Sequence, residues 1–251
     1  MSIVKPFKAV RPVPQKVKDV ACRPYDVLDS DEAKAEADGN PVSFYHVIKP
    51  EINFPSDADP YSEAVYKKGR ENYELLKSNG VLVQDQKEHY YVYQLVMNGQ
   101  QQTGIVGCCA IDDYFNNVIK KHELTRPDKE EDRKNHVRYG QINAEPVFFS
   151  YPHVDEMDAL VDQVKKSDQP VYDITTVDGI QHTLWVVKED DKIKTIEQLF
   201  DEHVPSIYVA DGHHRTAAGA LVGKEFRDKA NGNPNDGKRY NYFMAVLFPD
   251  N

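Results

Sequence analysis

The sequence has no long hydrophobic run and few cysteines. None of its apolar stretches approaches the ~18–20 residues that a membrane-spanning helix needs. The opening MSIVKPFKAVRPVPQ carries basic residues but lacks the apolar core of a secretory signal. The three cysteines, Cys22, Cys108 and Cys109, are odd in number and clustered, so they suggest no disulfide framework. These absences predict a cytoplasmic protein without a membrane segment.

Basic residues are also in deficit. The chain has 31 Lys and Arg against 41 Asp and Glu, which gives a formal net charge of −10. Tight nonspecific binding to nucleic acid depends on a basic face, so a nucleic-acid partner is disfavoured. The chain also lacks a Walker phosphate loop, a nicotinamide-binding fingerprint, Cys/His metal spacing and a Gly-x-Ser-x-Gly elbow. A small-molecule ligand remains the expected partner, and homo-oligomerisation is left open.

The order of elements predicts an α+β fold. Two β-rich runs surround Asn98-Gly99, and two more surround Asp178-Gly179, as expected for hairpins. Helices are predicted around them, and the one before the first hairpin begins at a cap on Asp59 and closes at Gly80. A short helix capped by Ser30 precedes a proline-flanked strand, PVSFYHVIKPE. This mixture of hairpins and helices predicts a mixed sheet with flanking helices.

The chain is expected to form one α+β unit over residues 1–251, and any internal boundary would fall near residues 150–155. A mixed-charge helical region over residues 112–140 is expected to be broken by Pro127. EPVFFSY and NYFMAVLF predict buried strands, and DEMDALVDQVKKS and KTIEQLFDEH predict helices.

The stretch SIYVADGHHRTAAGA, residues 206–220, is the most informative part of the chain. It predicts a buried strand, an elbow at Asp211-Gly212 and a closely packed helix. The free N–H groups at the start of a helix attract phosphate, and Arg215 could clamp two phosphate oxygens. His213 and His214 diverge by ~100° on a helix, so one of them would face the site while the other packs. The plainer alternative is that Asp211 only caps the helix.

The segment KKHELTRPDKEEDR, residues 120–133, is a second candidate. It fails as a zinc-protease box because the position four after His122 is Arg126 rather than histidine. On a helix, Lys129, Arg133 and His136 would share a face that could bind an anion. The alternative is a solvated helix whose charges pair at i,i+4, such as Glu130 with Lys134.

Two further segments carry weaker signals. In RPYDV, Arg23 and Asp26 could belong to a site, although a proline-rich turn explains them as well. His46 lies on the predicted strand, where a partly buried and hydrogen-bonded histidine is the ordinary interpretation. Cys108 and Cys109 lie in an apolar alternating run, which favours buried side chains over reactive thiols.

RPYDV, GNPVSFYHVIKPE, KKHELTRPDKEEDR, INAEPVFFSY and above all ADGHHR resemble the prokaryotic family catalogued as domain of unknown function (DUF) 1015. The resemblance runs from about residue 5 to residue 248. Members of that family are usually longer, so the chain looks like the N-terminal part of the family architecture. Through Asp-Gly-His-His-Arg the family is similar to the ParB/sulfiredoxin-like fold, which includes free-serine kinases using ADP or ATP.

The resemblance implies roles for particular residues. Asp211, Gly212, His213, His214 and Arg215 would line a nucleotide phosphate site, with Mg²⁺ near Asp211.

In the other segment, Glu123 would be the base that takes the proton of the acceptor hydroxyl, and Lys121 or His122 would neutralise developing charge. Lys121 and Arg126 would also help to bind the nucleotide. Thr216 stands where many relatives carry a bulky aromatic, so the helix could pack differently. The resemblance therefore predicts a nucleotide-dependent phosphotransferase that acts on a small hydroxyl-bearing metabolite such as free L-serine. A nucleotide-binding regulatory or sensor module without efficient catalysis is the alternative.

Overall fold

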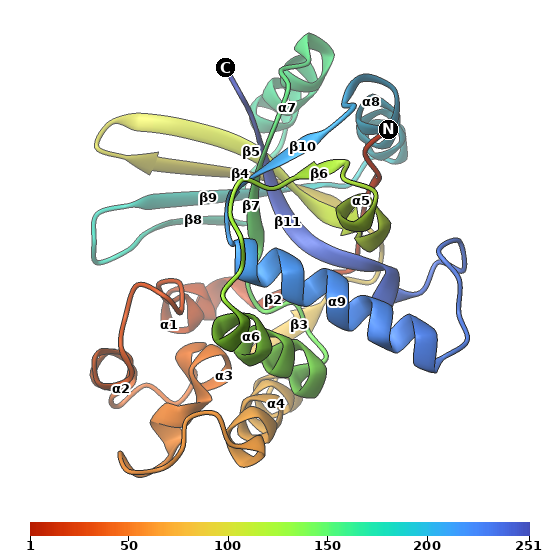
Figure 1. Ribbon diagram of the computed structural model, residues 1–251. Helices are drawn as coiled ribbons and strands as arrows, with labels where there is room; N and C mark the ends of the chain where they lie inside the picture. The colour runs from red at the N-terminus through yellow and green to blue at the C-terminus, as the bar shows by residue number, and fades with distance from the viewer.

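A computed structural model describes residues 1–251 and is built around one mixed sheet of nine strands. The order across the sheet is β6-β10-β7-β11-β5-β4-β9-β8, and β1 pairs separately with β5 (Figure 1). The pairs β10–β6 and β11–β7 are parallel and the others are antiparallel, so the predicted α+β class with a mixed sheet is confirmed. The strands are β1 (Val4–Lys5), β4 (Tyr90–Met97), β5 (Gln100–Ala110), β6 (Ile119–Lys120), β7 (Val147–Tyr151), β8 (Tyr172–Thr175), β9 (Gln181–Val187), β10 (Ile207–Asp211) and β11 (Tyr242–Pro249).

The helices lie in separate groups around this sheet (Figure 1). They are α1 (Val17–Val20), α2 (Ser30–Ala37), α3 (Tyr45–Ile48), α4 (Glu63–Ser78), α5 (Ile111–Phe115), α6 (Pro127–Gly140), α7 (Asp155–Ser167), α8 (Asp190–His203) and α9 (His213–Lys229). The helices α6 and α9 pack side by side, while α1 to α4 lie together with the small sheet of β2 (Val10–Pro12) and β3 (Leu82–Gln84). None of the helices combines the length and the apolar character that a bilayer crossing requires.

The main core lies between one face of the sheet and the helices α7 and α8. Strand side chains alternate between faces, so Tyr90 and Val92 of β4 and Phe243, Ala245 and Leu247 of β11 enter this core together. On α7 the buried residues follow a spacing of three and four, which places them on one face of the helix. The core members from these elements are Tyr90, Val92, Phe243, Ala245, Leu247, Met157, Leu160, Val161 and Val164. The opposite face of the sheet is left for a cleft.

Both predicted hairpins are confirmed. Asn98 and Gly99 have φ of 53° and 78°, the positive values that a two-residue turn of this kind requires. Met97 pairs with Gln100 directly across the turn. In the second hairpin Gly179 has φ of 80°, and Thr175 pairs with Gln181.

The prediction of a strand over PVSFYHVIKPE was wrong. This segment forms α3 and a 3-10 helix, Pro50–Asn53. Tyr45, Ile48 and Ile52 are buried in one cluster, and their spacing of three and four is that of a helix rather than a strand. His46 is therefore on a helix, but it is hydrogen-bonded as expected, to the Asn53 side chain and the Asn40 carbonyl oxygen.

Several predicted helix boundaries shift. The long N-terminal helix starts at Glu63, and Asp59 instead accepts a hydrogen bond from the Tyr61 N–H in the turn before it. The N-cap of α2 is Asp29, not Ser30, and its side chain accepts a hydrogen bond from the Glu32 N–H.

Pro127 begins a helix rather than breaking one. It occupies the first position of α6, where its missing N–H costs no hydrogen bond. The residues before it form α5, β6 and the loop over residues 121–126, so the predicted helical region of residues 112–140 is only partly helical.

Asp113 is a buried carboxylic acid on α5, and its protonation should be visible in the stability of the fold. It is 4% exposed and accepts a hydrogen bond from the Ile3 N–H. Burial raises the pKa of Asp113 from 3.8 to about 6, and the N-terminal amine and the Ile3 N–H oppose this while Asp112 and Asp201 add to it.

Because its folded-state pKa is the higher one, the folded protein binds a proton that the unfolded chain releases between pH 4 and pH 6. We therefore expect the unfolding free energy of the wild type to fall across this range relative to that of Asp113→Asn, by about 2 kcal/mol. Denaturant unfolding of both proteins at pH 4, 5, 6 and 7 measures this. A difference between the two proteins that stays constant with pH would contradict the assignment.

Candidate functional site

The elbow between β10 and α9 has an unusual helix start. Gly212 is the N-cap residue and has φ of 88° and ψ of 38°, a left-handed conformation that favours glycine. No side chain caps the helix, and none accepts a hydrogen bond from the N–H groups of His213, His214 or Arg215. The alternative in which Asp211 only caps the helix is therefore wrong.

Arg215 is held by the protein itself. Its guanidinium donates hydrogen bonds to the Asp211 carboxylate at 2.7 Å and to the Pro146 carbonyl oxygen at 2.8 Å. The Arg215 side chain is 13% exposed, and its Nε is buried without a partner. Arg215 is therefore not free to bind phosphate in the way that was predicted. A phosphate oxygen would first have to replace the Asp211 carboxylate as the acceptor of its hydrogen bond.

The guanidinium also lies against Gly212. A Cβ atom at this position would be 3.2 Å from Nε and 3.3 Å from Cζ of Arg215. We expect Gly212→Ala to lower the unfolding free energy by about 1–2 kcal/mol for the left-handed conformation, and further through displacement of Arg215.

Gly39→Ala is the matched control for this change. Gly39 has φ of 69° and nothing within 4 Å of an added Cβ, so only the backbone cost applies. Denaturant unfolding should show a larger loss for Gly212→Ala than for Gly39→Ala. Equal losses would mean that Arg215 moves aside freely.

The structure brings the two predicted segments together. Glu123 Oε2 is 3.4 Å from Nδ1 of His213, and the His122 ring meets the His213 ring edge-on, with centroids 4.4 Å apart. The Arg126 backbone N–H donates a hydrogen bond to His214 Nε2 at 3.1 Å. The loop over residues 121–126 therefore lies directly against the first turn of α9.

The two histidines differ as expected. His213 packs inward and is 8% exposed, whereas His214 is half-buried and contacts the loop. Burial, with the neighbouring His122, lowers the pKa of His213 below its ordinary value, so its ring is neutral at pH 7. Its Nε2 is buried without a hydrogen-bond partner.

Two predicted cations lie elsewhere. The Lys121 ammonium sits 3.9 Å from the centre of the Tyr114 ring and donates to the Tyr114 carbonyl oxygen at 3.2 Å. Arg126 is exposed and pairs with Asp128 at 2.9 Å. Neither side chain is directed to Asp211 by a contact, so the phosphate-binding role expected of them would require a rearrangement of the loop.

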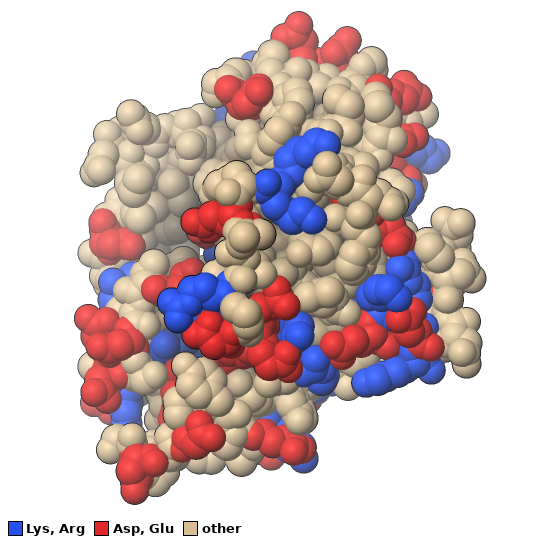
Figure 2. Space-filling view, in the orientation of Figure 1, with Lys and Arg blue, Asp and Glu red and all other residues tan.

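The elbow opens into a large cleft on the free face of the sheet. Its volume of ≈ 2960 Å³ exceeds the ~300–1,000 Å³ of an ordinary small-molecule pocket because the groove continues beyond the sheet to α8 and to residues 234–242. Asp211, Arg215 and Phe148 line it on the sheet side, and the turn from Cys22 to Pro24 lines it opposite. In Figure 2 a hollow is visible below the hairpins at the left, and charges of both signs are interspersed on the surface around it.

The sequence model of the family described as "Protein of unknown function (DUF1015)" matches residues 4–251. The chain belongs to this family. No match was found among curated proteins or among solved structures.

The predicted basic stripe of this DUF1015 chain does not form an anion-binding face. The Arg133 guanidinium donates to the neighbouring Asp132 carboxylate through Nε at 2.9 Å. His136 packs against the Tyr66 ring, and burial lowers its pKa to about 3. The alternative prediction, a helix whose charges pair at i,i+4, agrees better with the structure, since the Lys134 ammonium lies 3.9 Å from the Glu130 carboxylate.

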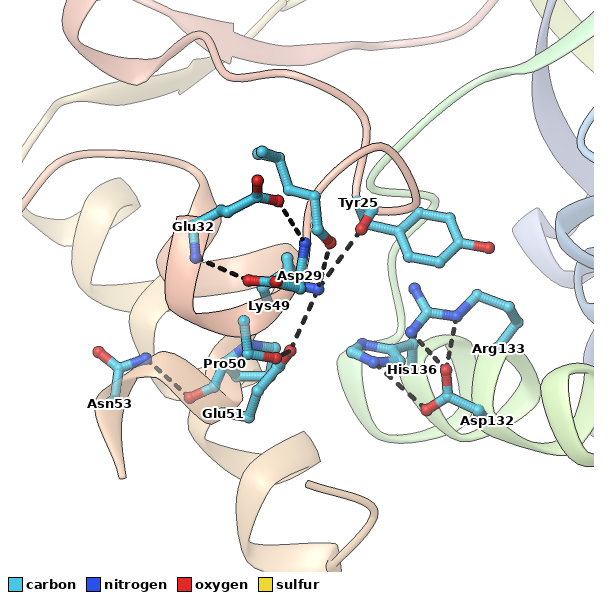
Figure 3. A network of polar contacts seen from close by, with 12 residues as sticks. Tyr25, Asp29, Glu32, Lys49, Pro50, Glu51, Asn53, Asp132, Arg133 and His136 are labelled. Atoms are coloured by element: carbon cyan, nitrogen blue, oxygen red, sulfur yellow. Dashed lines mark hydrogen bonds and ion pairs between the residues drawn. The ribbon is translucent and has the colours of Figure 1, made fainter. Parts of the chain in front are cut away.

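Two residues of the DUF1015 chain near Arg215, Tyr25 and Glu145, were missed from the sequence. The Tyr25 ring packs against the Arg133 guanidinium, with Cζ 3.8 Å from the ring centre (Figure 3). Arg215 Cζ is 5.9 Å from the same ring centre. The Tyr25 N–H donates to Glu145 Oε1 at 3.0 Å, and burial raises the pKa of Glu145. RPYDV pointed to the correct turn, but Arg23 pairs with Glu36 instead.

Lys49 holds this turn from the other side. Its ammonium donates to the carbonyl oxygens of Tyr25 and Leu28 at 3.4 and 3.2 Å and pairs with Glu51 at 3.4 Å (Figure 3). The turn is consequently fixed on both sides, and the Tyr25 ring is presented to the two arginines. Lys49, Arg133 and Glu145 are distant from Tyr25 in the sequence, and only the fold brings them into contact with it.

Asp211 is the one carboxylate of the elbow that could hold a metal. Its side chain is 63% exposed, and one oxygen is bonded to Arg215. No group of three or more His, Cys, Asp and Glu side chains is arranged so that it could hold a metal ion. This donor set fits Mg²⁺ bound through one carboxylate together with phosphate oxygens and water.

Proposed function

We propose that the chain is a nucleotide-dependent phosphotransferase, which moves a phosphoryl group from ATP or ADP to the hydroxyl of a small metabolite such as free L-serine. Its β10–Gly212–α9 segment would be the phosphate-binding part of a ParB/sulfiredoxin-like core. The observation that carries the proposal is the contact of the Glu123 loop with the uncapped start of α9. The candidate base, Glu123, and the candidate phosphate site at the start of α9 thereby lie next to each other.

The phosphates would bind at the start of α9. The N–H groups of His213, His214 and Arg215 have no side-chain acceptor, and the helix dipole favours an anion there. Arg215 would exchange the Asp211 carboxylate for a phosphate oxygen while keeping its bond to the Pro146 carbonyl oxygen. Once released from Arg215, Asp211 would be the residue that holds Mg²⁺, and the metal would supply charge neutralisation.

Glu123 would act as the general base. Its side chain is 66% exposed, so it can reach an incoming hydroxyl, while His213 Nδ1 at 3.4 Å limits its orientations. The acceptor oxygen forms a bond to the terminal phosphorus, its proton passes to Glu123, and the bond from phosphorus to the nucleotide oxygen breaks. The exposed His122 ring beside His213 would line the same space.

The direct test is to incubate the chain with Mg²⁺, free serine and either ATP or ADP, and to detect phosphoserine by mass spectrometry. Phosphoserine formed with either nucleotide would support the proposal. Nucleotide binding without transfer to serine or to other small hydroxyl compounds would contradict it.

One observation favours the regulatory alternative. The Asp211–Arg215 pair occupies the position that a phosphate would take, so a nucleotide would break this pair and alter the surface around β10 and α9. Such a module would bind nucleotide and release it unchanged, which the same incubation distinguishes from a kinase.

A further inference from the structure

The sheet presents an apolar strip to the cleft beside the elbow. Val147, Phe149 and Tyr151 of β7 enter the core, so Phe148 points to the opposite face, where it is half-buried and lines the cleft. On the neighbouring strand β11, Val246 and Phe248 line the cleft for the same reason. An aromatic ring in a solvent-connected cleft with polar surroundings is a candidate for contact with a planar ligand.

The Phe148 ring is held in place by its neighbours. The Phe248 ring meets it edge-on, with centroids 4.8 Å apart at 69°. Phe248 is itself buried, at 8% exposed, and rests across Gly104 of β5, where a Cβ would lie 2.9 Å from Phe248 Cδ1. A larger residue at position 104 would therefore collide with the Leu247 carbonyl oxygen and with the Phe248 ring. Phe148 is the more exposed of the two rings, and Phe248 supports it.

The strip begins next to the phosphate site. Asp211 and Phe148 are direct partners in the register of β10 and β7. Side chains of such partners start about 5 Å apart, and β11 adds one more strand spacing of about 4.8 Å. An anionic group at the start of α9 and a planar group on Phe148 would thus be separated by the width of one or two strands, which a ribose and diphosphate can bridge.

We propose that Phe148, supported by Phe248, is the platform on which the base of the nucleotide stacks. The inference rests on the proposed function, because it takes the nucleotide phosphates to bind at the start of α9. Aromatic rings stack on every base, and a purine offers the larger area. Purine nucleotides therefore bind more tightly than pyrimidine nucleotides with the same phosphates.

Isothermal titration with ADP, UDP and inorganic pyrophosphate tests this. Phe148→Leu keeps an apolar side chain in the strip but removes the ring, and it should weaken ADP binding by about ten-fold or more. Pyrophosphate, which has no base, should bind within about two-fold of its wild-type affinity. Tyr61→Leu is the matched control, since Tyr61 is 66% exposed and lies outside the lining of the cleft.

The outcomes separate the two proposals. Unchanged ADP affinity in Phe148→Leu would overturn the base platform, and so would an equal loss of ADP and pyrophosphate, which would indicate damage to the phosphate site. If the wild type bound pyrophosphate as tightly as ADP, the proposed stacking of the base on Phe148 would be wrong, whereas the proposed phosphate site at the start of α9 would be supported. A wild type that binds none of the three ligands would remove the proposed function itself.

Discussion

Glu123→Gln is expected to abolish phosphoryl transfer and to leave nucleotide affinity unchanged. The amide is similar in size to the carboxylate and can still contact His213, but it cannot take the proton of the acceptor hydroxyl. General-base catalysis contributes about 10²–10⁴-fold to a rate, so turnover should fall by at least about 100-fold. Single-turnover assays for kcat and titration calorimetry for the nucleotide Kd measure the two effects separately.

Glu156→Gln is a suitable control because Glu156 is an exposed carboxylate on α7, away from the elbow. It changes the net charge equally and should leave kcat as in the wild type. If Glu123→Gln turned over normally, Glu123 would not be the base, although the phosphate site at α9 would be unaffected. A variant that lost nucleotide binding instead would show that Glu123 contributes to the fold of the loop.

Arg215→Ala is expected to weaken nucleotide binding by about 10- to 100-fold, the loss associated with one charge-assisted hydrogen bond. The change also leaves Asp211 unpaired beside the phosphates, where its negative charge opposes them. Arg215→Lys should give an intermediate affinity, because an ammonium cannot match the fixed fork that reaches both Asp211 and the Pro146 carbonyl oxygen. Titration with ADP and ATP measures each affinity.

Lys224→Ala serves as the control on the same helix. Lys224 is an exposed cation that pairs with Asp228 one turn further along α9, far from the elbow. Its loss should leave nucleotide affinity unchanged. Wild-type affinity in a folded Arg215→Ala protein would exclude Arg215 from the phosphate site.

Local signals in the sequence predicted the elements whose geometry is itself local. Asn98-Gly99 specifies its hairpin because both residues adopt positive φ at little cost. The strand, elbow and helix around Gly212 follow from an apolar run, a glycine and a small-residue helix. Residues 41–51 were misread because a short apolar segment fits either period, and only its packing against α2 decides between them.

The contacts within the site could not be predicted in the same way. Arg215 reaches the Pro146 carbonyl oxygen, 69 positions earlier in the chain, and Tyr25 reaches Glu145 across 120 positions. Both contacts depend on the strand order, which hairpins and helices alone do not determine. The adjacency of Glu123 and His213 is of the same kind, since it results from the parallel pairing of β6 with β10.

The position of β11 has a consequence for biosynthesis. This strand lies between β7 and β5, yet every other strand of the sheet precedes it in the sequence. As the polypeptide leaves the ribosome, the facing edges of β5 and β7 therefore have unpaired backbone N–H and C=O groups until β11 is synthesised. Unpaired edges of this kind promote aggregation, and distant pairings form slowly. We therefore expect chaperones that bind the nascent chain until residues 242–249 have emerged to reduce its aggregation.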